Sequence, residues 1–164
     1  MKKLTVIVVL LITALWITPA LAQSASADKP ADNMQILRDK IKADKKLVVA
    51  ANMNLTESEA KGFWPVYEAY QKDLEKINAR AAAMIKSYAT AWNTKSMDNK
   101  KAKKLMSDFV ALQAAELKHV QSYIPKLNKV LPATKVARYL QIENKIRTIV
   151  KYDAAREIPL VPDE

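Results

Sequence analysis

The sequence predicts an all-α fold, and three observations lead to this expectation. Only one glycine is present in 164 residues, so the tight turns of a β-sheet have little to build on. Much of the chain is Ala, Lys, Leu and Glu, which favour helices. Apolar residues also recur every three or four positions over long stretches, which is the period of a helix packed on one side. We expect four helices in one domain, residues 33–158, followed by a tail at 159–164.

The first 22 residues have the pattern of a secretory signal peptide. Two lysines precede an apolar run from Leu4 to Ile17, and a small-x-small cleavage site ends at Ala22. The run is shorter than the roughly 20 residues that a membrane span needs, and no cysteine follows that could carry a lipid anchor. Cleavage after Ala22 would leave 142 residues with a net charge of +8. A small, polar lead-in follows at 23–32. We therefore expect a periplasmic protein.

The positive charge favours anionic partners but does not select one kind among them. A basic protein outside the cytoplasm meets little nucleic acid, so nucleic acid is not an expected partner. Anionic lipid head groups, polysaccharides and acidic polypeptides are better candidates. Net charge also keeps a protein soluble, so it does not select among these partners by itself. Without cysteine the fold has no disulfide staples.

The first two helices are expected on either side of a short break near residue 55. The first spans about residues 33–51, and the second begins at Thr56, which can form a capping box with Glu59. The apolar side of the first is Met34, Leu37, Ile41, Val48 and Ala51. The second has a row that alternates spacings of four and three, as in a coiled coil. This row is Phe63, Tyr67, Tyr70, Leu74, Ile77, Ala81, Met84, Tyr88 and Ala91.

The third and fourth helices follow a turn near residues 93–98. Ser96 or Asp98 can cap the third helix, and its row has the same alternation of four and three. This row is Met106, Val110, Gln113, Leu117, Val120, Ile124, Leu127 and Leu131. The fourth helix begins near Pro132, a residue favoured at the first position, and ends before Pro159. Its apolar side is Tyr139, Ile142, Ile146 and Ile149.

The second and third helices should pair as a long antiparallel hairpin. With the turn between Asn93 and Asp98, Pro65 comes opposite the neighbourhood of Pro125. Each proline removes a backbone hydrogen bond and tends to bend its helix, and Gly62 lets the backbone yield. We therefore expect a shared elbow at Gly62, Pro65 and Pro125. The aromatic residues at this level are Phe63, Trp64, Tyr67 and Tyr70.

The same register leads to two further expectations about side chains. It pairs Gln113 with Asn78, so we expect a buried amide that fixes the register of the hairpin. Three of the elbow aromatics lie on the apolar row, which favours ordinary core packing. Trp64 lies off the row, so core packing and an exposed, ligand-facing position are both open for it.

Catalytic and metal-binding motifs are not expected. Glu116 and His119 have the i, i+3 spacing of carboxylate-bridged metal bundles, but those sites need a second such pair. His119 is the only histidine, and we expect it on the surface. The methionines do not cluster, and neither a Gly-rich phosphate loop nor a cysteine nucleophile is present. We predict no enzyme, no cofactor and no metal site.

The turn between the second and third helices concentrates positive charge. Lysines near a helix N-terminus oppose the helix dipole, and this cost suggests a use such as docking on an anionic surface. A solvated tip is the alternative. The lysines are Lys95, Lys100, Lys101, Lys103 and Lys104, with Asp98 among them.

These features together resemble the Spy/CpxP group of periplasmic proteins, the LTxxQ family. The segment LTESE at 55–59 matches the first family motif, except that Glu59 stands for glutamine. In the second motif, within VLPATKVARYLQIE at 130–143, Pro132 and Lys135 replace threonine and glutamine. The segments GFWPVYEAYQ and RYLQIENKIR resemble an uncharacterised proteobacterial branch of envelope proteins more closely.

The resemblance implies a cradle-shaped antiparallel homodimer that binds unfolded clients without ATP, or an accessory that restrains an envelope-stress sensor. The apolar stripes also exceed what one hairpin hides, so either the first and fourth helices fold back into a closed bundle or two chains share the surplus; we favour a homodimer. We therefore expect a periplasmic chaperone-like or stress-accessory protein. The residues expected to bind a client or partner are Phe63, Trp64, Tyr67, Lys100, Lys101, Lys103 and Lys104. The alternative is a structural or adaptor protein whose basic tip docks on anionic envelope surfaces.

Overall fold

The computed structural model describes residues 44–162. The predicted signal peptide (1–22), the lead-in (23–32), the start of the predicted first helix and residues 163–164 lie outside the described residues. The described part contains helices and no strand, so the predicted all-α fold is confirmed. In chain order the helices are α2 (Lys45–Met53), α3 (Glu57–Asn93), α4 (Asn99–Asn128) and α5 (Ala133–Glu157).

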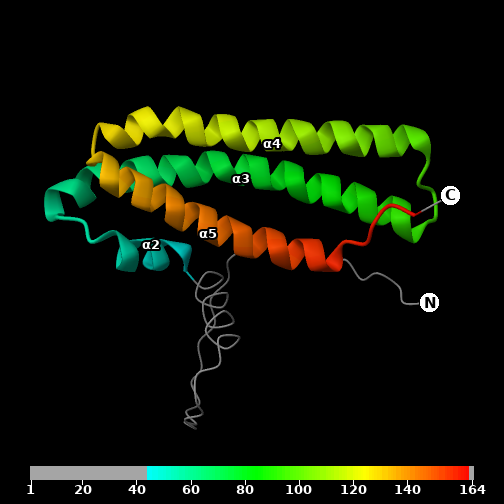
Figure 1. Cartoon of the computed structure of the whole chain (residues 1–164), viewed down its shortest axis with the longest axis horizontal. Helices are drawn as coiled ribbons and strands as arrows, with labels where there is room; N and C mark the ends of the chain where they lie inside the picture. The colour runs from blue at the N-terminus through cyan, green and yellow to red at the C-terminus, as the bar shows by residue number, and fades with distance from the viewer. Residues whose placement is uncertain (1–43, 163–164) are drawn as a thin grey trace, which may run out of the picture.

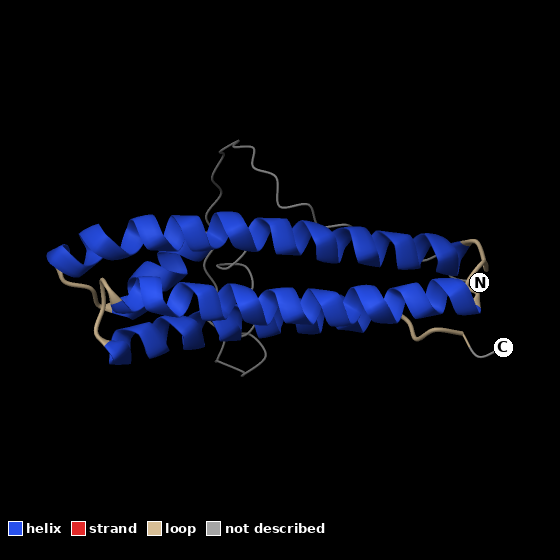
Figure 2. Ribbon diagram, turned by 90° about the horizontal axis from the view of Figure 1, so that it is seen from above, coloured by secondary structure: helices blue, strands red, loops and turns tan. Residues whose placement is uncertain are grey.

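The three long helices lie side by side as an elongated bundle (Figure 1). α3 and α4 run in opposite directions along most of their length, and α5 returns along them (Figures 1 and 2). The short α2 packs against α5 at the end that is far from the α3–α4 turn. Among the described residues, no helix is both long and apolar enough to cross a membrane.

The helix ends follow the sequence signals closely. Thr56 caps α3 and forms the expected capping box with Glu59, and a hydrogen bond from Lys135 of α5 lowers the pKa of the Glu59 carboxyl. Asp98, one of the two predicted caps, accepts the Lys101 N–H at 2.7 Å and starts α4. Pro132 is the residue just before α5, where its fixed φ suits the helix that follows.

The predicted apolar row of α3 forms its buried side. Its buried members are Phe63, Tyr67, Tyr70, Leu74, Ile77, Tyr88 and Ala91. Aromatic rings link this row to the other helices. Tyr70 packs edge-on against Tyr123 of α4 at 5.2 Å between ring centroids, and Phe63 against Tyr139 of α5 at 5.1 Å. The core of the bundle is therefore an aromatic layer, concentrated in the half that lies away from the turn.

The predicted apolar row of α4 is wrong over its first half. Met106, Val110 and Leu117 are exposed by 61%, 65% and 60%, and Gln113 and Asn78 are both exposed rather than paired in the core. The side chains of α4 that are buried are Leu112, His119, Tyr123 and Leu127. The helix is thus rotated by about one residue, roughly 100°, from the orientation that the sequence predicted.

His119 is buried, so its expected surface position is also wrong. Only 7% of the residue is exposed, and its ring centroid lies 4.2 Å from that of Tyr70 and 4.9 Å from that of Tyr123. Its Nε2 atom is buried without a hydrogen-bond partner. Burial, followed by the nearby Arg147 charge, lowers the pKa of the imidazole. The aromatic neighbours therefore favour the neutral form of the imidazole over the charged form.

A buried carboxylate that the sequence did not predict joins three helices. Glu143 of α5 is 2% exposed, and it accepts hydrogen bonds from Lys45 of α2 at 2.7 Å and from Gln71 of α3 at 2.8 Å. Lys45 also donates to the Gln71 side-chain oxygen at 2.8 Å. Each polar atom in this group has a partner, which is the condition under which a buried charge is tolerated.

The shared elbow at Gly62, Pro65 and Pro125 stays a prediction. Pro65 and Pro125 are both inside helices that continue past them. The structure gives Gly62 a packing role. Its φ is not positive, and a Cβ atom there would lie 3.1 Å from the Cβ and Cγ1 atoms of Val130. The missing side chain lets Val130 pack directly on the α3 backbone.

We expect Gly62→Ala to lower the free energy of unfolding by about 1 kcal/mol. The gain in helix propensity, roughly 1 kcal/mol, is outweighed by overpacking against Val130, which typically costs 1–3 kcal/mol. Urea unfolding followed by circular dichroism measures the difference. The double variant Gly62→Ala with Val130→Ala should recover most of the loss. A single Gly62→Ala variant that is clearly more stable than the parent would show that Val130 does not restrict this site.

Candidate functional site

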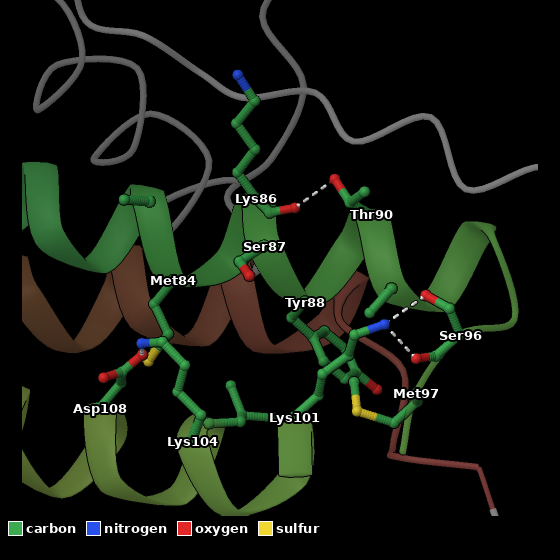
Figure 3. Close-up of a pocket in the computed structure, with 13 residues that line it drawn as sticks. Met84, Lys86, Ser87, Tyr88, Thr90, Ser96, Met97, Lys101, Lys104 and Asp108 are labelled. Atoms are coloured by element: carbon green, nitrogen blue, oxygen red, sulfur yellow. Dashed lines mark hydrogen bonds and ion pairs between the residues drawn. The ribbon is translucent and has the colours of Figure 1, made fainter.

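A shallow groove opens between α3 and α4 next to the turn that joins them (Figure 3). Its volume is about 470 Å³. We call it the tip groove. The residues that line it are Ala83, Met84, Lys86, Ser87, Tyr88, Thr90, Ala91, Ser96, Met97, Lys101, Lys104, Leu105 and Asp108.

The floor of the tip groove is apolar. Met84 of α3, Met97 of the turn and Leu105 of α4 are all half-buried. Small residues of α3, Ala83 and Ala91, leave space between the helices. A second hollow of about 270 Å³ shares several of these residues and continues towards Leu112 in the middle of α4. The two hollows form an extended, open trough, a shape that suits a peptide segment better than a compact small molecule.

Hydrogen bonds hold the closed end of the groove in shape. The N–H of Ser96 donates to the carbonyl of Ala91 at 2.9 Å, and the Thr94 and Ser96 hydroxyls lie 2.8 Å apart. Lys95 takes the left-handed conformation, with φ of 50°, which lets the chain reverse. The Lys101 ammonium then donates to the Ser96 carbonyl and to its hydroxyl at 2.9 Å (Figure 3).

Lysines form the rim of the groove. Lys101 and Lys104 rise from the first turns of α4 towards α3, whereas the side chain of Lys86 on α3 points away from α4 (Figure 3). Lys104 pairs with Asp108, four residues further along α4. The other predicted tip lysines are also exposed in this region: Lys95, Lys100 and Lys103. An anionic group that entered the groove would therefore meet several positive charges near the positive end of a helix dipole.

The C-terminal tail runs beside the same groove. Tyr88 lines the groove, and its hydroxyl donates to the carbonyl of Pro159 at 2.9 Å. Burial raises the pKa of this hydroxyl, so it remains a donor at neutral pH. Leu160, the next residue of the tail, is 89% exposed. The tail thus adds apolar surface near the groove.

The aromatic residues expected to bind a client are mostly core. Phe63 and Tyr67 are 0% and 4% exposed, so neither can contact a ligand in the folded protein. Trp64 is half-buried, and its ring packs edge-on against Phe63 at 5.0 Å and Tyr67 at 5.3 Å. Lys46 of α2 lies over the Trp64 ring at 5.2 Å, a cation–π contact. The position of Trp64 favours a role in holding α2 against α3.

The structure does not bring the two predicted sets of binding residues together. Trp64 lies near the start of α3, and the lysines lie beyond its end at Asn93. A helix of some 30 residues separates them by about 45 Å at 1.5 Å per residue. Of the predicted binding residues, only Lys101 and Lys104 line a groove. Met84 and Met97 were not predicted to bind, because they are 13 residues apart on different elements. The sequence feature that could have indicated the groove is Met84, a large flexible side chain that follows three alanines.

No group of three or more His, Cys, Asp or Glu side chains that could hold a metal ion occurs within residues 44–162. Comparisons with family models, with curated proteins and with solved structures find no match. The arguments about function therefore rest on the tip groove and its surroundings.

Proposed function

We propose that this protein is a periplasmic, ATP-independent polypeptide-binding protein of the chaperone-like or envelope-stress accessory kind. One observation carries the proposal, namely that the tip groove combines an apolar floor with a rim of lysines. A groove of this chemistry fits an extended segment with an apolar side chain beside an acidic one. Unfolded and partner polypeptides both offer such segments.

In this proposal the two parts of the groove have separate tasks. The lysines attract acidic segments over a distance of about 8 Å at physiological salt and raise the rate of capture. The floor formed by Met84, Met97 and Leu105 then holds an apolar side chain. Methionines suit this task because their flexible side chains adapt to different partners. A shallow site of this size binds reversibly, so release needs no nucleotide.

A second candidate function is an adaptor that docks on anionic envelope surfaces. It is favoured by Lys100 and Lys103, which are exposed at the tip but outside the lining of the groove. Head groups or polysaccharides would contact these lysines without using the apolar floor. The two functions therefore differ in whether Met97 and Leu105 are needed.

We expect Lys104→Glu to weaken holding of an unfolded acidic protein by roughly tenfold at low salt, because a rim charge that attracts the client becomes repulsive. Fluorescence anisotropy with a labelled, reduced and alkylated acidic protein measures the affinity, and light scattering of a heated substrate measures suppression of aggregation. Lys118→Glu is the matched control, since Lys118 lies on the same helix, is exposed and is outside the groove.

Equal losses in Lys104→Glu and Lys118→Glu would mean that net charge acts and the groove does not. Met97→Asp separates the two functions, because it should abolish client holding and leave binding to anionic vesicles intact. Vesicle binding without any holding of unfolded protein would support the adaptor and reject the chaperone-like function.

A further inference from the structure

The residues that follow α5 have the same chemistry as the segment that the tip groove is proposed to bind. Ile158 has an extended backbone, with φ of −94° and ψ of 113°, and two prolines after it oppose a helix. Apolar residues and two acidic residues therefore follow one another in a short, non-helical segment. This tail consists of Ile158, Pro159, Leu160, Val161, Pro162, Asp163 and Glu164.

A single side chain, that of Tyr88, contacts both the tail and the tip groove. Its ring lines the groove, and its hydroxyl donates a hydrogen bond to the Pro159 carbonyl at 2.9 Å. The tail also reaches the same end of the bundle as the α3–α4 turn (Figure 1). The five residues after Pro159 span about 17 Å when extended, and the lining of the groove on α4, residues 101–108, covers about 10 Å. The tail is therefore long enough to enter the groove.

Leu160 is the apolar residue of the tail that has no packing partner of its own size in the structure. It is 89% exposed, more than any other large apolar side chain among residues 44–162. The floor of the groove, formed by Met84, Met97 and Leu105, is apolar and only half-buried. Contact between Leu160 and this floor would remove apolar surface of both from water, which is favourable.

The charges of the tail complement those of the groove. Asp163 and Glu164 are the charged residues beyond α5, and Lys101 and Lys104 line the groove. The partner of Lys104 is now Asp108, in a pair whose side chains are 72% and 42% exposed. Exposed pairs contribute little to stability, so Lys104 can exchange this carboxylate for one of the tail. The positive end of the α4 dipole favours the same carboxylates.

From these observations we propose that the tail competes with clients for the tip groove. Residues 160–164 fold back, Leu160 contacts the apolar floor, and the acidic residues meet the lysines. The structure shows the open arrangement, with Leu160 in solvent. A client has to displace the closed tail, so its apparent affinity is reduced to the fraction of molecules that are open. The competition rests on the proposed function, whereas the folding back of the tail does not.

Disulfide trapping tests the closed arrangement without any client, and the chain has no natural cysteine that would interfere. We expect Leu160→Cys with Met97→Cys to form an intramolecular disulfide at least ten times faster than Leu160→Cys with Lys103→Cys. Lys103 is the matched control because it is exposed at the same end of α4 but does not line the groove. Equal rates for the two pairs would show that the tail has no preference for the groove and would overturn the proposal.

A chain that ends at Pro159 tests the competition, because it keeps the contact with Tyr88 and lacks the competing residues. It should bind the labelled, reduced and alkylated acidic protein about fivefold more tightly than the full chain, since a tethered segment competes at a millimolar effective concentration. Fluorescence anisotropy measures both affinities. A synthetic peptide of residues 158–164 should displace the labelled protein from the shortened chain, and the same peptide with Leu160→Ser should not.

The two measurements separate a failure of this proposal from a failure of the proposed function. Equal affinities of the full and shortened chains for the labelled protein would reject competition by the tail and leave the proposed function intact. If neither chain binds the labelled protein, the proposed function is rejected, and the disulfide rates still decide whether the tail enters the groove.

Discussion

Glu143→Ala is expected to lower the free energy of unfolding by about 3 kcal/mol, the low end of the range for breaking a buried ion pair. The substitution leaves the Lys45 ammonium and the Gln71 amide without the acceptor that they share. The low end applies because the Lys45 side chain is 25% exposed and can turn towards water. Urea unfolding of the parent and variant at pH 7.5 measures the loss.

Two matched variants test the reason for this effect. Lys45→Met alone should be at least as costly, since it leaves a carboxylate that is only 2% exposed without its counter-charge. The double variant Lys45→Met with Glu143→Met should recover most of the stability, because apolar replacement of a whole buried pair is often neutral. A loss below about 0.5 kcal/mol in Glu143→Ala, the range of ordinary surface substitutions, would remove this group as a structural element.

Stability is expected to fall as the pH is lowered below about 6.5, the ordinary pKa of histidine, and His119 is the reason. Its pKa in the folded protein is lowered, so the unfolded chain binds a proton that the folded chain does not. The neutral ring contributes stability at pH values above 6.5, and this contribution is lost as the pH falls towards the folded pKa. The loss is at most about 1.4 kcal/mol for each pH unit in that window.

Replacing the imidazole isolates its effect. His119→Phe keeps a ring between Tyr70 and Tyr123 and removes the unpaired Nε2 atom, so the variant should lose most of the pH dependence between pH 6.5 and 5. Proton NMR of the only histidine gives its folded pKa directly. Asp73, whose pKa is held at about 2 by Lys76 and Tyr123, acts only below pH 4. If the free energy of unfolding of His119→Phe depends on pH as it does in the parent, other groups cause the loss of stability.

The sequence predicted α3 well because its apolar row has no competitor. Beyond Tyr67 the residues between the members of this row are mostly charged, polar or alanine, so only one side of this helix could be buried. α4 offers two adjacent rows, and the mainly aliphatic one, with Met106 and Leu117, has the more regular repeat. The bundle instead buries the row with His119 and Tyr123. Their rings pack against the ring of Tyr70. A pattern of apolar residues in the sequence does not reveal such a ring contact between helices.

The sites that depend on long-range contacts were the hardest to predict. The group formed by Lys45, Gln71 and Glu143 joins three helices. Each member is polar and lies off the predicted apolar row of its helix, so the sequence alone predicts a surface position for it. The tip groove was anticipated only through its lysines. Its floor needs Met84 and Met97 to line the same groove, and this depends on how tightly the chain reverses at Lys95 and Ser96.

The trough formed by the tip groove and its continuation is short compared with an unfolded chain. Its lining on α4 runs from Lys101 to Leu112, which is about 16 Å at 1.5 Å per residue. About five extended residues of a client cover this length. In the proposed function the rest of the client would therefore stay in solvent, where it can begin to fold while one segment is held.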